Sequence, residues 1–232
     1  MSSKFKNWII GKICAACGER NQRIWDDIYQ FDRDYSWEYE LWQRQDEALN
    51  EACTAARKLG QSDAPADQAA SLVKLLELSD AGHPFAMLSV GSRYQKGIGV
   101  EKDLKRAAEY YRESLNAGSW LATLYYAGVM YQLGNYEKAF DVLESNVRNK
   151  HSPSFFWLAH YRFKRKKSRK VAREIRPLLE YLHEFEHQGA RTMLNMLQVL
   201  GFYGLREIMI GWKGITAPDP AKSDEARKSE AR

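Results

Sequence analysis

One short segment of this chain has the residue types and the spacing of a zinc-binding site, two histidines four positions apart with a glutamate beside the first. The run reads His183-Glu184-Phe185-Glu186-His187. On one helix this spacing would place both imidazoles on one face, where they could hold a zinc ion while Glu184 acts as a general base. No third ligand is apparent downstream. A metal-dependent hydrolase using His183, Glu184 and His187 is therefore an alternative hypothesis, not the leading one.

The cysteines and the glycine pairs give no stronger indication of catalysis. Cys14 and Cys17 form a Cys-x-x-Cys pair, but no second pair completes a tetrahedral zinc site, and Cys53 makes the count odd. We expect Cys14 and Cys17 to be buried thiols in a helix, and we expect no disulfide framework and a reducing, cytoplasmic setting. Gly97-x-Gly99 lacks the further glycines and the preceding strand of a phosphate-binding loop. The sequence thus predicts a protein without a cofactor and without enzymatic activity.

Charge is distributed unevenly along the chain. The formal net charge is +5, yet acidic residues gather between positions 26 and 51 and basic residues between 162 and 176. Clustered cations favour an acidic protein surface or anionic lipid headgroups as partners, and nucleic acid is the less favoured interpretation. This basic segment consists of Arg162, Lys164, Arg165, Lys166, Lys167, Arg169, Lys170, Arg173 and Arg176.

The elements that carry these residues repeat along the chain. Ala81-Gly82 and Ala117-Gly118 stand about 36 residues apart, and each pair ends one helix-like stretch and precedes another. A period of roughly 33 to 45 residues with helical patterning inside it is typical of a solenoid of helical hairpins. We therefore predict an all-α, right-handed solenoid. The first helices of its hairpins are expected to begin near Pro84, Trp120, Pro153 and Ala190.

Local signals mark the turns of the best-defined hairpin. Pro84 suits the first turn of a helix, and Gly97 and Gly99 suit a turn that needs unusual backbone angles. Asp103 is placed to cap the second helix, and Gly118 to end it. Within the hairpin, small residues occur where the two helices must cross, and tyrosines can fill the space beyond the crossing. The small residues are Ala86, Gly91 and Ala107, and the tyrosines are Tyr94 and Tyr110.

The stretch from Ala86 to Gly118 resembles the Sel1-like repeat, a relative of the tetratricopeptide repeat. The following units, up to residue 188, resemble the pattern more loosely. The resemblance implies a bacterial, cytoplasmic adaptor or scaffold that binds other proteins without catalysis. The matching positions are Ala86, Val90, Gly91, Tyr94, Gly97, Gly99, Val100, Asp103, Arg106, Ala107, Tyr110 and Gly118.

The inner surface of such a solenoid is lined by the first helices of its hairpins. Exposed tyrosine, arginine and histidine side chains on this surface suit protein recognition. We therefore predict a protein partner at this concave face. The residues expected to face inward to solvent are Ser89, Arg93, Lys96, Tyr125, Gln132, His160 and Lys164.

Four parts are expected along the chain. They are an aromatic-rich helical N-terminal region or cap (1–60, with a helix over 35–59), the repeats (68–188), an apolar C-terminal capping helix (189–212) and a disordered tail (217–232). Polar residues within 193–212 argue against a transmembrane span. We expect this helix to pack on a partner or on another copy of the chain, with a membrane interface as the alternative. The protein is accordingly expected to be cytoplasmic, or peripheral to the inner membrane.

Overall fold

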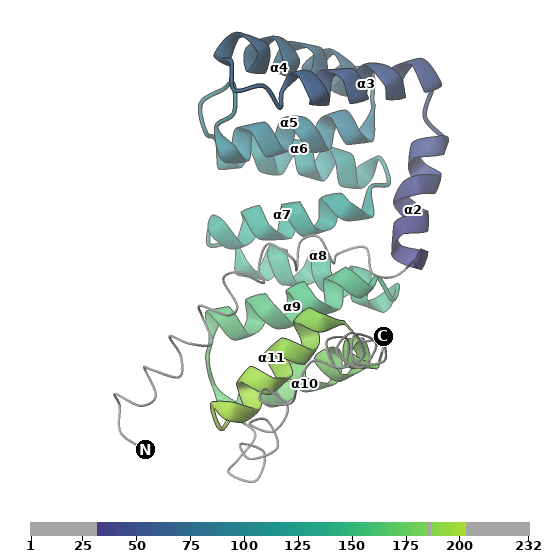
Figure 1. Cartoon of the computed structure of the whole chain (residues 1–232). Helices are drawn as coiled ribbons and strands as arrows, with labels where there is room; N and C mark the ends of the chain where they lie inside the picture. The colour runs from purple at the N-terminus through teal and green to yellow at the C-terminus, as the bar shows by residue number, and fades with distance from the viewer. Residues whose placement is uncertain (1–31, 185–186, 203–232) are drawn as a thin grey trace, which may run out of the picture. The chain divides into compact units, whose positions relative to one another are not determined.

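The computed structural model describes residues 32–184 and 187–202, without the side chains of 32–37 and 152. Every regular element in this part of the chain is an α-helix (Figure 1), so the predicted all-helical fold is confirmed. The described residues form two compact units, a large unit that ends at Tyr161 and a small unit that begins at Arg162. The helices are α2 (Asp32–Gln43), α3 (Glu47–Leu59), α4 (Pro65–Asp80), α5 (Pro84–Lys96), α6 (Leu104–Asn116), α7 (Trp120–Gln132), α8 (Tyr136–Arg148), α9 (Ser152–Arg165), α10 (Arg169–His183) and α11 (Gln188–Val199).

The large unit is a stack of helical hairpins. From α3 to α8 each helix packs against the next (Figure 1), and α3 pairs with α4 just as α5 pairs with α6. The predicted starts at Pro84 and Trp120 are confirmed for α5 and α7, while α9 and α11 begin slightly before Pro153 and Ala190. The repeated Ala-Gly junctions therefore do mark the hairpin boundaries.

The ends of successive helices share one hydrogen-bonding pattern. After α4, the amide of His83 donates to the carbonyl of Leu78 (3.0 Å), and Gly82 between them has a φ of 87°. Gly118 after α6 has a φ of 102°. Glycine adopts such angles without the steric penalty of a Cβ atom, which makes it the usual residue in this helix-ending turn. Lys150 takes the equivalent place after α8, with a φ of 60°.

The α5 and α6 helices cross closely at Gly91. A Cβ atom at this glycine would lie 2.7 Å from ring carbons of Tyr111 and 3.2 Å from the carbonyl oxygen of Ala107. Tyr94 and Tyr110 stack with ring centroids 5.7 Å apart. The small residue and the tyrosine pair predicted for this hairpin are confirmed, and Tyr111 is the ring that covers Gly91.

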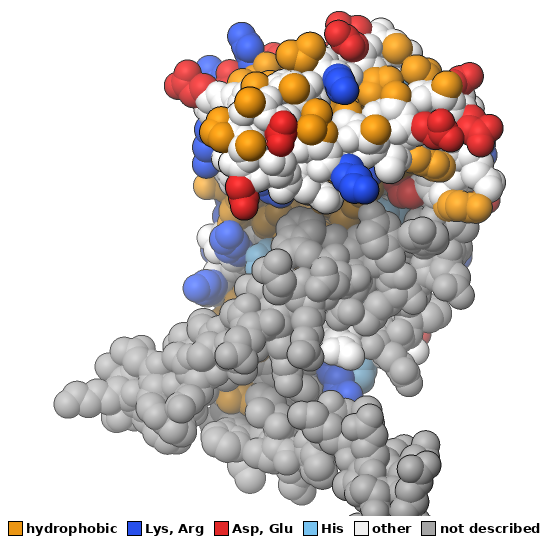
Figure 2. All heavy atoms as spheres, turned by 45° about the horizontal axis from the view of Figure 1, so that its top comes forward, with side chains coloured by type: hydrophobic (Ala, Val, Ile, Leu, Met, Phe, Trp, Pro, Cys, Tyr) orange, Lys and Arg blue, Asp and Glu red, His pale blue; other side chains and the backbone are white. Residues whose placement is uncertain are grey.

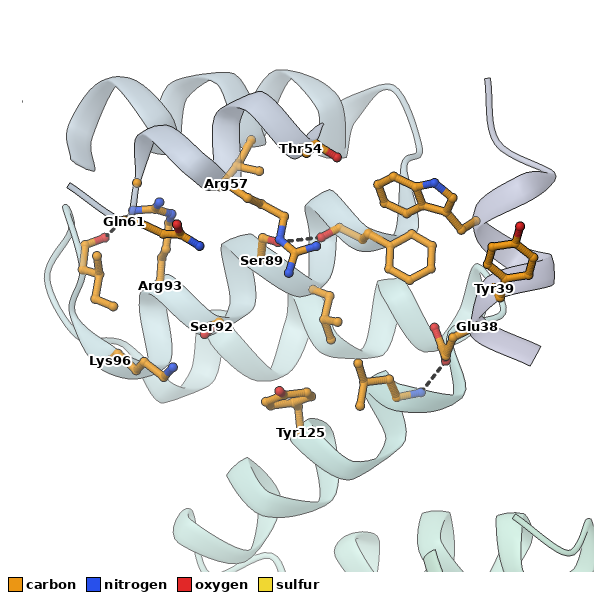
Figure 3. A pocket seen from close by; sticks show the side chains of 17 residues that line it. Glu38, Tyr39, Thr54, Arg57, Gln61, Ser89, Ser92, Arg93, Lys96 and Tyr125 are labelled. Atoms are coloured by element: carbon orange, nitrogen blue, oxygen red, sulfur yellow. Dashed lines mark hydrogen bonds between the residues drawn. The ribbon is translucent and has the colours of Figure 1, made fainter. Parts of the chain in front are cut away.

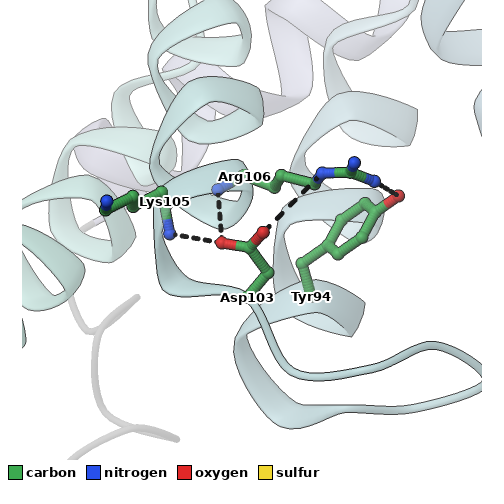
Figure 4. Close-up of polar contacts among 4 residues, drawn as sticks. All are labelled: Tyr94, Asp103, Lys105 and Arg106. Atoms are coloured by element: carbon green, nitrogen blue, oxygen red, sulfur yellow. Dashed lines mark hydrogen bonds and ion pairs between the residues drawn. The ribbon is translucent and has the colours of Figure 1, made fainter.

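Asp103 caps α6, as predicted (Figure 4). Its carboxylate accepts hydrogen bonds from the amides of Lys105 (2.8 Å) and Arg106 (3.0 Å). The Arg106 guanidinium also lies 3.6 Å from this carboxylate and 3.4 Å from the hydroxyl of Tyr94. Because Arg106 is largely exposed, its ion pair adds little. The capping bonds, together with the amide of Asp103 donating to the Tyr94 carbonyl (2.9 Å), tie the end of α5 to the start of α6.

The single helix expected over residues 35–59 is wrong, because two helices occupy this stretch. α2 ends at Gln43, and Asp46 then caps α3 by accepting a hydrogen bond from the amide of Leu49 (3.2 Å). The break lets α3 pair with α4 while α2 runs to α7. The helix expected before residue 32, together with Cys14 and Cys17, lies outside the described residues.

Figure 2 shows the α3–α4 end of the large unit. Apolar side chains on this face lie between charged groups of both signs. Val73 is 55% exposed, and the other apolar residues that α4 exposes are smaller, namely Pro65, Ala66, Ala69 and Ala70. Small side chains and mixed charge suit the end of a repeat array, which must face water.

The small unit contains α10 packed against α11. Contrary to the expectation of a capping helix over residues 189–212, α11 ends at Val199, and Gly201 follows with a φ of 76°. A glycine with positive φ ends a helix as it does after α4 and α6. Residues 203–212 and the tail lie outside the described residues. None of the described helices is long and apolar enough to cross a membrane.

Candidate functional site

A hollow of about 800 Å³ opens on the large unit between α2, α3, α5 and α7 (Figure 3). We call this hollow the groove. Its volume falls within the range of roughly 300–1,000 Å³ that is usual for ligand sites. Three of its four walls, α3, α5 and α7, are first helices of hairpins, and α5 supplies more of the lining residues than any other helix.

One face of α5 forms the middle of the groove. Phe85, Leu88, Ser92 and Lys96 line it and follow one another three or four positions apart, which is the spacing of one helix face. Ser89 lies on the same face, and its hydroxyl donates to the carbonyl of Phe85 (2.7 Å). Along α5 the groove therefore changes from apolar at the start of the helix to cationic at its end.

Aromatic rings form the apolar end of the groove. Trp42 of α2 meets Phe85 edge-on, with ring centroids 5.0 Å apart, and contacts His83 in the same manner at 5.7 Å. Leu121 of α7 completes this end. Such a surface suits the burial of an apolar side chain, because aromatic rings offer large contact areas with few rotatable bonds.

Glu38 closes the apolar end by capping α7 (Figure 3). Its carboxylate accepts hydrogen bonds from the amide of Leu121 (2.6 Å) and from the hydroxyl of Ser119 (3.2 and 3.3 Å). Burial raises the pKa of this carboxyl, and the hydrogen bonds from α7 oppose that effect. An acid at a helix N-terminus is favourable because it meets unpaired amides. The carboxylate of Glu38 is thus occupied by the fold.

Arg93 was expected to face solvent, and the structure corrects this. The residue is only 6% exposed. Its guanidinium donates to the hydroxyl of Ser71 (2.7 Å) and to the carbonyls of Gln68 (3.3 Å) and Ile98 (3.4 Å). Arg93 touches the groove, but its donors join α4 to the turn after α5. Its burial, which lowers the pKa of the guanidinium, follows from long-range packing that helical spacing does not reveal.

Two cations, Arg57 and Lys96, line the groove with exposed side chains. Figure 3 shows Arg57 reaching in from α3 and Lys96 at the end remote from Glu38. Among the described residues neither cation lies within salt-bridge distance of a carboxylate. The groove therefore offers two exposed positive charges and no exposed acid of its own.

The remaining predicted groove residues divide into two sets. Tyr125 lines the groove together with Ser89 and Lys96, and burial raises the pKa of its hydroxyl. Gln132, His160 and Lys164 do not line it. His160 instead lies among aromatic rings, 5.5 Å from Trp157 and 5.5 Å from Tyr161 between ring centroids. Three residues that line the groove were not predicted to do so, namely Glu38, Trp42 and Arg57. They precede the predicted repeats, so no repeat pattern indicates which way their side chains point.

The proposed pair of metal-binding histidines does not share a helix. His183 is the last residue of α10, whereas His187 caps α11, its Nδ1 accepting a hydrogen bond from the amide of Ala190 (3.1 Å). The helix break between them removes the common face that metal binding would need. No group of three His, Cys, Asp or Glu side chains among the described residues could hold a metal ion. Cys53 is buried, and burial raises the pKa of its thiol.

His83 has the same capping role at the start of α5. Its Nδ1 accepts a hydrogen bond from the amide of Ala86 (3.2 Å), and its Nε2 lies 3.0 Å from Oδ1 of Asn50. Since the amide of Asn50 donates to the carbonyl of Trp42 (2.9 Å), its oxygen accepts, and His83 must carry its proton on Nε2. The bonds therefore require a neutral imidazole, and burial lowers its pKa accordingly.

The stability of the large unit should fall as the medium becomes acidic. Because the folded-state pKa of His83 is lowered, the unfolded chain binds more protons below about pH 6.5, and stability is lost from there downward at up to about 1.4 kcal/mol per pH unit. We expect His83→Ser to flatten this dependence, since serine caps without titrating, as Ser119 does for α7. Urea unfolding at several pH values measures both slopes. Equal slopes in the two proteins would show that His83 is not the titrating group.

The basic segment, from Arg162 to Arg176, belongs to the small unit. Lys166, Lys167 and Arg169 are exposed, and among the described residues none of them lies within salt-bridge distance of an acid. Lys170 lies 4.0 Å from Glu174. Several of these cations stand at the N-terminus of α10, where the helix dipole is positive and disfavours them. Helix stability therefore does not explain the cluster.

Comparison with known proteins finds a likeness in structure and none in sequence. No family model matches the chain, and no curated protein matches it. A crystal structure of a Sel1 repeat protein from Oxalobacter formigenes is similar, with a TM-score of 0.47 and 15% sequence identity, over 85% of this chain and 86% of that chain.

Proposed function

We propose that the large unit binds a segment of another protein in the groove and that the chain acts as a non-catalytic scaffold. The observation that carries the proposal is the groove itself. Aromatic rings line one end, and the exposed cations Arg57 and Lys96 lie toward the other end. First helices of hairpins form most of the walls. Aromatic and arginine side chains in a concave surface are frequent centres of protein recognition.

The chemistry of the lining residues favours binding over catalysis. The carboxylate of Glu38 is engaged by the start of α7, and the guanidinium of Arg93 is engaged by α4 and the following turn. A general acid or base must reach a reacting atom in a usable protonation state. Glu38 and Arg93 are both held by the fold and cannot reach a reacting atom in this way. The lining therefore offers no available carboxylate or imidazole, and its other ionisable residues are Arg57, Lys96, Tyr39 and Tyr125.

Replacing Leu88 by glutamate should weaken partner binding by about tenfold or more, because it puts a negative charge in place of an apolar side chain in the middle of the groove. Val73→Glu is the matched control, since Val73 is an exposed apolar residue of α4 that does not line the groove. Photo-crosslinking from position 92 in the native host would identify a partner, with position 109 on α6 as the reference. The affinities of the Leu88 and Val73 variants for that partner are then compared with that of the wild type. Equal affinities would contradict the proposal.

The basic segment supports a second candidate function, association with an anionic membrane surface. The supporting observation is the cluster of exposed cations at the N-terminus of α10, which the helix dipole disfavours. Cations near an anionic surface gain on the order of 1 kcal/mol each. This function is compatible with the scaffold proposal, because the groove lies entirely within the large unit.

Reversing charge at Lys166, Lys167 and Arg169 to glutamate should abolish binding to phosphatidylglycerol vesicles. Folding should be unaffected, because an acid at the first position of α10 suits the helix dipole. Wild-type binding should also fall steeply with salt, as the Debye length shrinks from about 10 Å at 0.1 M to about 3 Å at 1 M. Vesicle co-sedimentation is the measurement, and reversal of Lys58, Lys74 and Lys105 is the control of equal charge. Vesicle binding that changes neither with salt concentration nor with charge reversal at Lys166, Lys167 and Arg169 would rule out the basic segment as the membrane-binding surface.

A further inference from the structure

The two ends of the groove differ in chemistry, and this difference restricts what can occupy it. Trp42, Phe85 and Leu121 form an apolar end beside α2. Lys96 and Gln61 lie at the opposite end, and Arg57 reaches in between (Figure 3). A partner that fills the groove must therefore match an apolar surface at one end and positive charge toward the other.

The charges of the groove are not balanced within the described residues. The single lining carboxylate, that of Glu38, accepts hydrogen bonds from Ser119 and Leu121 and is only 8% exposed. It does not face Arg57 or Lys96 as an ion-pair partner. The two exposed cations thus have no carboxylate partner among the lining residues and can pair with an anionic group of a bound partner.

From this polarity we propose that the groove receives a short extended segment of a partner protein that carries an acidic side chain and an apolar one. The acidic side chain lies against Arg57 and Lys96, and the apolar side chain lies among Trp42, Phe85 and Leu121. This inference rests on the proposed scaffold function and names the class of partner that the same groove selects.

The length of α5 sets the separation between the two side chains. Its 13 residues extend over about 20 Å at 1.5 Å per residue. An extended peptide advances about 3.3 Å per residue, so about six residues reach from one end of the groove to the other. An acidic residue about four to six positions from a tryptophan, phenylalanine or leucine would therefore place each side chain at its matching end.

A displayed library of random linear peptides, selected on the full-length protein, tests this inference. We expect the enriched peptides to pair an acidic with an apolar residue at that separation. Titration of one enriched, fluorescently labelled peptide then compares wild type with Arg57→Glu/Lys96→Glu. Binding should weaken about tenfold or more, because two attractive charges become repulsive. The control Lys58→Glu/Lys74→Glu makes the same charge change outside the groove and should alter affinity less than about twofold.

A second arm replaces the acidic residue of the peptide by its amide. Wild-type affinity should drop by a similar factor, whereas the Arg57→Glu/Lys96→Glu variant should lose nothing or gain. Peptides that lose affinity for the Leu88→Glu variant yet tolerate both charge changes, in the protein and in the peptide, would overturn the acidic preference and leave the scaffold function standing. A selection without any groove-dependent peptide would count against both proposals. Preference for a free fatty acid over every peptide would likewise overturn the inference.

Discussion

Loss of the Arg93 guanidinium is expected to lower the free energy of unfolding by about 2–3 kcal/mol. In Arg93→Leu the hydroxyl of Ser71 and the carbonyls of Gln68 and Ile98 lose a charged donor, and bonds to charged groups contribute about 1.5–3 kcal/mol each. Lysine should not restore the loss, because it lacks the planar fork that reaches several acceptors. Lys96→Leu, one turn further along α5 and exposed, should stay within about 0.5 kcal/mol of wild type. Urea denaturation measures all three variants.

Gly60 provides an independent check on the position of Arg93. A methyl group at Gly60 would overlap the guanidinium, so Gly60→Ala should destabilise the wild type. In the Arg93→Leu background the clash with the guanidinium disappears and the close contact with the Ser71 hydroxyl oxygen (2.6 Å) remains, so part of that cost should disappear. We therefore expect a double-mutant cycle of Gly60→Ala and Arg93→Leu to give a coupling free energy of about 1 kcal/mol or more. Additive effects would mean that the guanidinium does not lie against Gly60.

Substitution of Gly91 is expected to destabilise the α5–α6 hairpin, by about 1–3 kcal/mol for leucine. Alanine gives the sharper test, because within a helix it normally stabilises by about 0.5–1 kcal/mol relative to glycine. Here the added Cβ would lie 2.7 Å from ring carbons of the fully buried Tyr111, so the sign should reverse. Thermal unfolding followed by circular dichroism gives the change directly.

Gly128 of α7 is the matched control for this test. A Cβ atom at Gly128 would lie 3.1 Å from the hydroxyl oxygen of Tyr161, which is the end of a side chain and not a ring face. Gly128→Ala should therefore cost less than Gly91→Ala. If alanine stabilised the protein at both positions, the close crossing of α5 and α6 would be refuted.

The first well-matched hairpin could be read from the sequence because its signals are local. Pro84 at a helix start, Asp103 as a cap and Gly118 as a stop act on residues within a few positions of themselves, and all three lie where they were expected. The same holds for Gly91, whose small size indicates a close crossing between adjacent helices. Repetition of such signals about every 36 residues was enough to predict stacked hairpins.

The groove was predicted only in part, because its composition depends on contacts between distant residues. Ser89, Lys96 and Tyr125, which helical spacing places on the inner face of the hairpins, do line it, and their role in partner binding stays a prediction. The sequence alone could not show that Arg93 would turn inward to bond α4, because that depends on which carbonyls α4 presents once it has packed.

The apolar end of the groove was decided entirely by the tertiary structure. Glu38 meets the start of α7 across a separation of 81 residues, and nothing in the local pattern around it distinguishes it from neighbouring acids. The break between His183 and His187 is similar, since both positions fit one helix until His187 is required to cap α11. The sequence determined the hairpins because helix stops and close crossings are short-range. The tertiary structure determined which polar side chains the fold occupies and which remain exposed, because that depends on every helix packed around them.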